Sequence, residues 1–293
     1  MDISVALGGG GAKGNSHIGV LRFLEQEGFR IRAIAGSSFG GMVACFYAAG
    51  FRPAQIEEIF SSMDQTRLYD RSKDEGSSLL GLSRIAKWLE HNFRERTFDD
   101  LVIPCAVTAV DLRTSRELVL QKGRVRDAIL STIAIPGIFP SFLMEEFELV
   151  DGALLNPVPV ALARSLAPSV PVVAVSLGEP LGTPPRSVPF PLLDNLPPPL
   201  VSGLTNLRVA KAFDVFMRSI DIGSRHIEEL RFQIEKPDVI IHPEVDEIGA
   251  LDRVDVHEVA MLGEAAARAK LPELRRATSW TTRLRKDLFG DHR

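Results

Sequence analysis

The chain has 293 residues, of which 45% are hydrophobic and 25% charged, and its formal net charge is −4. This balance is that of a globular protein with a sizeable buried core, and it excludes wholesale disorder. The weak negative charge gives no general attraction to polyanions, so we expect no nucleic-acid partner.

In chain order, short apolar strands alternate with helices. Strands are predicted at residues 3–7, 30–36, 102–110, 116–121, 147–151, 170–177 and 238–243. Helices are predicted at residues 16–27, 37–50, 53–63, 124–134, 157–166 and about 255–270. This alternation is typical of a mostly parallel sheet that is covered on both faces. We therefore expect an α/β fold with a central sheet between two helical layers.

Two cysteines and the N-terminus bear on the cellular compartment. Cys45 and Cys105 each lie in an apolar run, and we expect buried reduced thiols rather than a disulfide or a metal site. Residues 1–10 have neither a basic region nor a long apolar stretch, so no signal peptide is predicted. The apolar run at residues 34–50 is interpreted as core rather than as a membrane span. A cytoplasmic protein is expected, soluble or peripheral on the inner membrane.

Residues 8–14 place four consecutive glycines and a lysine between a strand and a helix. Bare amides in such a loop bind an anion, either a phosphate or the oxyanion of a tetrahedral intermediate. The Walker pattern fails because Lys13 is followed by Gly14. The dinucleotide pattern G-x-G-x-x-G does match at Gly9, Gly11 and Gly14, so a nucleotide-binding oxidoreductase is one alternative. That pattern also needs an acidic residue after the second strand, and none is present, which favours an oxyanion hole.

Gly36, Ser38 and Gly40 form the pattern G-x-S-x-G between a predicted strand and a buried helix. This setting is that of a nucleophile elbow, where a strained serine presents its hydroxyl group. The flanking glycines avoid clashes with the neighbouring strand and helix. The alternative is a tight turn at the start of a helix, in which Ser37 or Ser38 only caps the helix.

A serine hydroxyl needs a positioned base before it becomes a good nucleophile. Asp151 ends a predicted strand at a glycine turn, where the catalytic loops of parallel sheets lie, and an aspartate can act as the base directly. A plain Asp-Gly turn is the alternative. His242 ends another strand and is a second candidate base, whereas His17 is expected to be structural. The six histidines are His17, His91, His226, His242, His257 and His292.

Together these motifs resemble those of the patatin-like phospholipase family, above all its bacterial soluble members, which are similar to the esterase domain of neuropathy target esterase. The family's motif G-G-G-x-[RK]-G is matched by residues 9–14, with Lys13 at the basic position. The elbow falls at Ser38 and the D-G-[GA] motif at Asp151. The resemblance covers about residues 2–177 well and the region from Asp238 onward more loosely.

The resemblance implies a patatin-like three-layer fold and an enzyme that cleaves acyl esters of lipids through an acyl-enzyme, with neither metal nor cofactor. Ser38 would attack the ester carbonyl, and Asp151 would take and return the proton without a histidine. Lys13 would either steady the glycine loop or neutralise a lipid phosphate. The expected oxyanion donors are the amides of Gly9, Gly10 and Gly11, and the expected supporting residues are Lys13, Gly14, Gly36, Gly40 and Gly152. A catalytically silent lipid-binding scaffold is the remaining alternative.

Residues 1–277 are interpreted as the catalytic domain and residues 278–293 as a basic C-terminal tail. Within the domain, residues 178–215 hold a Pro-rich loop, a candidate lid, followed by a helix. The apolar residues of this loop are Phe190, Leu192, Leu193, Leu196 and Leu200. The tail spaces Trp280, Leu284 and Leu288 by four residues among basic side chains, a pattern suited to a membrane surface. A solvated tail is the alternative.

Overall fold

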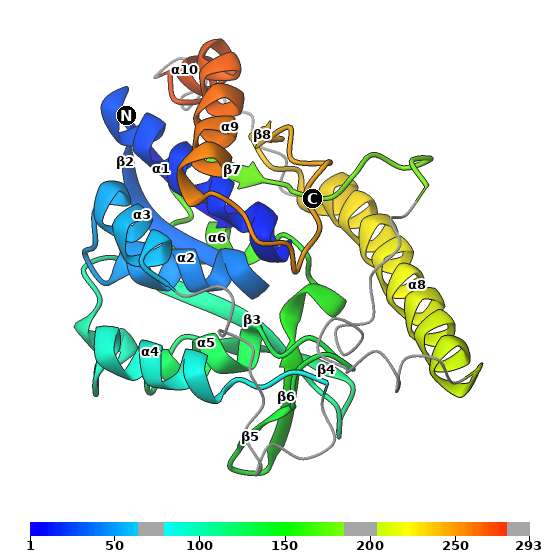
Figure 1. Cartoon of the computed structure of the whole chain (residues 1–293). Helices are drawn as coiled ribbons and strands as arrows, with labels where there is room; N and C mark the ends of the chain where they lie inside the picture. The colour runs from blue at the N-terminus through cyan, green and yellow to red at the C-terminus, as the bar shows by residue number, and fades with distance from the viewer. Residues whose placement is uncertain (64–78, 185–203, 280–293) are drawn as a thin grey trace.

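The structure is a computed structural model that describes residues 1–63, 79–184 and 204–279. Its strands form one eight-stranded sheet in the order β5-β6-β3-β2-β1-β7-β8, with β4 paired to β3 (Figure 1). The strands are β1 (Asp2–Leu7), β2 (Arg30–Ser37), β3 (Cys105–Asp111), β4 (Arg116–Leu120), β5 (Phe142–Met144), β6 (Phe147–Asp151), β7 (Val172–Val175) and β8 (Val239–Ile241).

The sheet has a parallel centre and an antiparallel margin. β1 pairs in parallel with β2 and β7, and the pairs β2–β3 and β7–β8 are also parallel. β4 and β6 run antiparallel to β3, and β5 runs antiparallel to β6. The predicted α/β class with a mostly parallel sheet is therefore confirmed.

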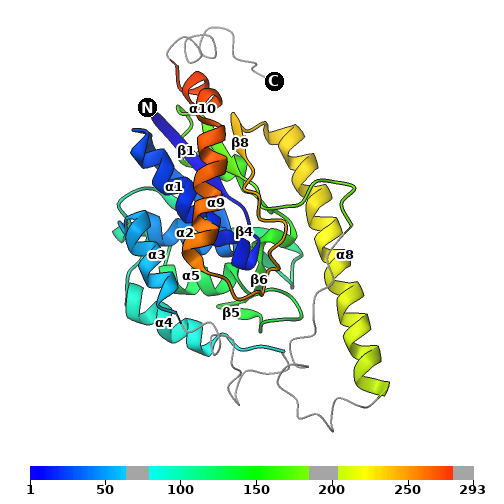
Figure 2. The same cartoon turned by 45° about the horizontal axis from the view of Figure 1, so that its top comes forward.

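The described helices cover both faces of this sheet (Figures 1 and 2). They are α1 (Ser16–Gln26), α2 (Ser38–Ala48), α3 (Pro53–Ser61), α4 (Ser83–Phe93), α5 (Val125–Thr132), α6 (Val160–Leu166), α8 (Leu204–Glu235), α9 (Val256–Ala269) and α10 (Leu271–Ala277), with short 3-10 helices η1 (Gly11–Asn15), η2 (Phe98–Asp100) and η3 (Gly152–Leu154). The large core joins one sheet face to α1, α2 and α5, and a smaller core joins the other face to α6. These two cores are the physical basis of the three layers.

Most predicted elements are confirmed, and the helix expected after the Pro-rich loop begins at Leu204. Helix α4 was not predicted, although its buried residues Ile85, Leu89 and Phe93 recur every four positions as in an amphipathic helix. Cys45 and Cys105 are both buried and free. The apolar residues of the Pro-rich loop from Phe190 to Leu200, and the tail residues from Trp280 onward, lie outside the described residues. In the described part of the chain, no helix is both long and apolar enough to cross a membrane.

Helix α9 packs closely along α1 because glycines face each other at the contact. A Cβ added to Gly19 of α1 would lie 1.7 Å from the carbonyl oxygen of Ala260, and one added to Gly263 of α9 would lie 1.8 Å from that of Ser16. Real Cβ atoms cannot approach so closely, so the two helix backbones meet where only glycine fits. This packing fixes the C-terminal part of the chain against the N-terminal part.

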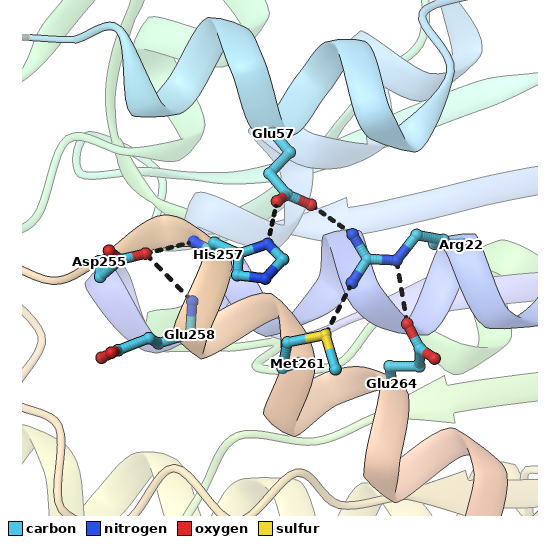
Figure 3. A network of polar contacts seen from close by, with 7 residues as sticks. All are labelled: Arg22, Glu57, Asp255, His257, Glu258, Met261 and Glu264. Atoms are coloured by element: carbon cyan, nitrogen blue, oxygen red, sulfur yellow. Dashed lines mark hydrogen bonds and ion pairs between the residues drawn. The ribbon is translucent and has the colours of Figure 1, made fainter.

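A polar network closes the same contact on the surface (Figure 3). The guanidinium of Arg22 in α1 donates to Glu57 in α3 and, at 3.0 Å, to Glu264 in α9. The Nδ1 atom of His257 lies 2.6 Å from Oε1 of Glu57. Asp255 accepts the amide of His257 and so caps the start of α9. The segment that leads into α9 is thereby held in one position.

Candidate active site

Ser38 lies where β2 meets α2, with a positive φ of 53° that non-glycine residues rarely adopt. A Cβ added to Gly36 would lie 2.5 Å from the backbone of Gly40, and one added to Gly40 would lie 2.4 Å from the carbonyl oxygen of Gly8. Larger residues at either position would therefore clash with backbone atoms. The turn has the strained geometry that the G-x-S-x-G pattern predicts.

The hydroxyl of Ser38 donates a hydrogen bond of 2.5 Å to Oδ2 of Asp151, and both residues are 5% exposed. The other carboxylate oxygen, Oδ1, accepts the amide of Ala153 at 2.8 Å. Burial raises the pKa of Asp151 to about 7, although the hydrogen bonds from Ser38 and Ala153 act in the opposite direction. A carboxyl group with such a pKa can accept a proton near neutral pH.

The strand that places Asp151 beside Ser38 differs in direction from the one that the sequence suggested. It was predicted at the carboxyl edge of parallel strands, but β6 runs antiparallel to β3, with Asp151 opposite Ala109. The adjacent residue of β3, Thr108, lies opposite Ser37 of β2. Because β6 ends beside the middle of β3, its last residue comes next to the elbow. A Cβ on Gly152 would lie 2.2 Å from Oγ1 of Thr108, so glycine is required at this turn.

Thr132, at the end of α5, is a residue that the motifs did not reveal. Its Oγ1 accepts the backbone amide of Ser38 at 2.8 Å, and its side chain is buried. This bond fixes the serine backbone in its strained conformation. Thr132 lies 94 positions from Ser38, so no local pattern could have identified it.

The glycine loop lies directly against the serine. A Cβ on Gly9 would be 3.1 Å from Cβ of Ser38 and 3.0 Å from Cβ of Ala153. The amide of Gly9, however, donates to the carbonyl oxygen of Pro157 at 3.0 Å. Gly9 was expected to be an oxyanion donor, but its amide already has a backbone partner in this structure. Within the described residues, the amides of Gly10 and Gly11 make no such backbone hydrogen bond.

His17 anchors the start of this loop. It is completely buried, and its Nε2 lies 2.8 Å from the carbonyl oxygen of Gly8. Since a carbonyl oxygen can only accept, Nε2 carries the proton. Burial lowers the pKa of His17 to about 4, and the bond to Gly8 opposes that shift only in part. The imidazole is therefore neutral near pH 7 and has the structural role expected of it.

His242, the second candidate base, belongs to a different set of charges. Burial lowers its pKa, the carboxylate of Asp246 raises it, and Lys13 lowers it further. In the described parts of the chain, the hydroxyl of Ser38 is hydrogen-bonded to Asp151 and to no histidine. The geometry thus favours the carboxylate as the proton acceptor.

The segment before α9 covers the middle of the glycine loop. Gly11 has a φ of +58°, and a Cβ added to it would lie 2.1 Å from the carbonyl oxygen of Ala250. The same oxygen accepts the amide of Ala12 at 2.8 Å. In the dinucleotide-binding pattern the glycines instead allow a pyrophosphate to approach the backbone. The close contact with Ala250 does not favour that alternative.

A pocket opens beside Ser38 and Gly11, and its lining is almost entirely apolar. Side chains from α2, α4 and the region after α5 form most of its wall, namely Phe39, Met42, Ile85, Trp88, Ile133 and Phe139. Such a lining suits a hydrocarbon chain. Over residues 1–63, 79–184 and 204–279, no three His, Cys, Asp or Glu residues lie close enough together to hold a metal ion.

Comparison with known proteins agrees with this arrangement. The sequence profile of patatin-like phospholipases matches residues 5–164, which include the glycine loop, the elbow and Asp151. Because the match covers more than half of the chain, the protein belongs to the patatin-like phospholipase family. The resemblance inferred from the motifs is confirmed.

Relatives with curated sequences include NTE family proteins. An uncharacterized NTE family protein of Mycobacterium tuberculosis is 34% identical over 178 residues, 60% of this chain and 49% of the relative. A second one from the same species is 27% identical over 289 residues, 92% of this chain and 46% of the relative. Patatin-like phospholipase domain-containing protein 6 of Mus musculus is 27% identical over 192 residues, 60% of this chain and 14% of the relative. The chain therefore spans about half the length of the first two relatives and a much smaller share of the third.

A solved structure shows the same fold. VipD from Legionella pneumophila superposes with a TM-score of 0.56 and 12% sequence identity, and the match covers 94% of this chain and 67% of VipD. At this identity the likeness concerns the fold alone.

Proposed function

We propose that the protein is a serine acyl hydrolase that cleaves acyl esters of lipids. The observation that carries the proposal is the 2.5 Å hydrogen bond between a serine held at positive φ and a buried carboxylate. Burial raises the pKa of that carboxylate, Asp151, to about 7. A nucleophile in contact with a base of suitable pKa is the arrangement that acyl transfer needs.

In the proposed mechanism, Oγ of Ser38 attacks the ester carbonyl carbon while its proton moves to Oδ2 of Asp151. The tetrahedral intermediate then expels the alcohol, which takes the proton from Asp151, and an acyl-serine remains. Water attacks the acyl-serine, again losing a proton to Asp151, and the fatty acid leaves as Ser38 regains its proton. Asp151 thus acts as base and acid in turn, and no histidine takes part.

The oxyanion would be stabilised by the amides of Gly10 and Gly11. Gly11 lines the same pocket as Ser38, and neither amide makes such a backbone hydrogen bond in the described part of the chain. The N-terminus of α2 adds a favourable partial positive charge at Ser38. Preorganised donors of this kind commonly contribute ~3 kcal/mol each to stabilisation of the transition state.

The substrate class follows from the family and from the pocket. Membership of the patatin-like phospholipase family supports a lipid substrate, and the apolar wall beside Ser38 would accept the acyl chain. Peripheral membrane contact through residues 178–200 or through the C-terminal tail stays a prediction, because most of these residues lie outside the described ones.

The test is hydrolysis of p-nitrophenyl butyrate and of a short-chain phosphatidylcholine by the wild type and by Ser38→Ala. We expect the variant to lose at least about 1,000-fold in kcat and to escape labelling by a fluorophosphonate. Ser37→Ala is the matched control, because Ser37 is the neighbouring buried serine and its hydroxyl accepts a hydrogen bond from Thr108 at 3.1 Å. A wild-type protein that neither hydrolyses these esters nor becomes labelled would favour the silent scaffold.

A further inference from the structure

The side chain of Lys13, in the glycine loop, is turned away from solvent. It is 12% exposed, and its Nζ donates to Oε1 of Glu179 at 3.4 Å. Leu177, two residues before Glu179, lies against the loop as well, because a Cβ on Gly10 would be 2.9 Å from its Cδ1 atom. The segment after β7 therefore packs against the glycine loop through Leu177 and Glu179.

Glu179 is the centre of a buried series of charges. Its side chain is 3% exposed, and its Oε2 lies 3.0 Å from Nη2 of Arg225 in α8, which is 8% exposed. The guanidinium also pairs with Asp221, one turn earlier in α8, and donates to the carbonyl oxygen of Thr183 at 3.2 Å. Charges of alternating sign thus run from the glycine loop to α8, the long helix at the side of the molecule in Figure 1.

Because these charges are buried, their interactions affect the local structure more strongly than a surface salt bridge would. Exposed ion pairs contribute little because water solvates and screens both partners. A buried carboxylate, by contrast, needs cations to offset its lost hydration, and removing it leaves a buried cation without that partner. Without Glu179, Lys13 would lose its ion-pair partner while Arg225 kept Asp221, so we expect the lysine to move and the loop to shift with it.

We propose that Glu179 and Arg225 are positioning residues that hold Lys13, and through it the amides of Gly10 and Gly11, in the geometry of the oxyanion hole. This inference rests on the proposed function, since it concerns the same site. The inference also assigns a role to Lys13. Because its charge is already matched by the carboxylate of Glu179, Lys13 steadies the loop instead of binding a lipid phosphate.

The two roles of Lys13 give different results with two substrates. If the lysine bound phosphate, Glu179→Gln would free the cation and improve hydrolysis of a phospholipid relative to a neutral ester. If Glu179 positions the oxyanion donors, the same variant would slow both substrates equally, because both form the same oxyanion. KM would change little, since the ground-state contacts of the substrate are unaffected.

The experiment compares kcat and KM for p-nitrophenyl butyrate and diheptanoyl phosphatidylcholine. For Glu179→Gln we expect kcat to fall by about 10- to 100-fold on both substrates, with KM within about 2-fold of the wild type. Arg225→Gln should show the same pattern, and Arg225→Lys should recover much of the activity because it keeps the cation. Arg218→Gln is the matched control, since Arg218 pairs with Asp214 in α8 in the same i, i+4 manner but is 39% exposed.

The outcomes separate this proposal from the proposed function. A folded Glu179→Gln or Arg225→Gln variant with wild-type kcat would overturn the positioning role, as would a loss confined to the phospholipid. If Glu179→Gln does not fold, as judged by circular dichroism, Arg225→Gln decides. A wild type that is inactive and resists fluorophosphonate would mean that the proposed function itself has failed.

Discussion

The serine–carboxylate pair and the glycine loop lie side by side, yet they are held in different ways. Ser38 and Asp151 are fixed by neighbouring strands and by Thr132, all within residues 5–164 that match the family profile. The loop contacts Glu179 and Ala250 in addition, and Glu179 pairs with Arg225, all beyond that range. The contact between Ser38 and Asp151 therefore lies within the part that matches the family profile, whereas the glycine loop also has contacts with the C-terminal part of this chain.

Asp151→Asn disrupts the Ser38–Asp151 pair directly. It keeps the shape of the side chain but removes its ability to accept the serine proton. We expect kcat for p-nitrophenyl butyrate to fall by about 100- to 10,000-fold, the range typical of a lost general base. Steady-state kinetics against Asp127→Asn, a carboxylate in α5 that is paired with Arg126, provides the control. Full activity in Asp151→Asn would mean that a histidine, such as His242, is the base.

Gly11→Ala is the corresponding change in the loop. The new methyl group would meet the carbonyl oxygen of Ala250 at 2.1 Å and would also be strained by the φ of +58°, so the Gly10 and Gly11 amides must move. We expect kcat to fall by about 100-fold.

Gly28→Ala separates the effect of backbone strain from that of the clash with Ala250. Gly28 has a φ of +77° but no atom within 4 Å of an added Cβ. It should lose about 1 kcal/mol of stability in a denaturant titration and keep its kcat. Equal kinetic effects of the two variants would contradict a specific role for the contact with Ala250.

The sequence motifs singled out Ser38 and Asp151, which the structure places in contact, but they did not reveal the residues around this pair. The reason is the range of the contacts. The motifs at Ser38 and Asp151 are local, because a strained turn needs glycines beside it. The alternation of strands and helices likewise predicted the three layers. Which amides of the glycine loop stay unpaired depends on partners such as Pro157, which is 148 positions from Gly9 in the chain, and no local pattern carries that information.

Two glycine variants test how closely the C-terminal part of the chain, through α9, packs on α1. Gly263→Ala would place a methyl group 1.8 Å from the carbonyl oxygen of Ser16 and should destabilise the protein by about 1 to 3 kcal/mol. Gly223→Ala in α8, where nothing lies within 4 Å, should instead stabilise it by about 0.5 to 1 kcal/mol. Thermal unfolding of both variants gives the comparison, and equal stabilities would show that the helices do not pack as described.

The smallest expected effect comes from the surface network of Figure 3. The side chain of His257 is 64% exposed, and Glu57 keeps its contact with Arg22 when the imidazole is removed. His257→Ala should therefore lower the free energy of unfolding by less than about 1 kcal/mol and leave kcat unchanged. A large kinetic effect would mean that this network, and not only helix packing, sets the position of the loop.

The most direct test of the account is the pH dependence of kcat/KM for p-nitrophenyl butyrate in the wild-type protein. Only the ionised form of Asp151 can accept the serine proton, so kcat/KM should rise with pH and reach half of its plateau near pH 7, the value to which burial raises the pKa. The residual activity of Asp151→Asn should lack this rise. A wild-type rate that is constant down to pH 5, or the same rise in Asp151→Asn, would show that this carboxylate is not the base.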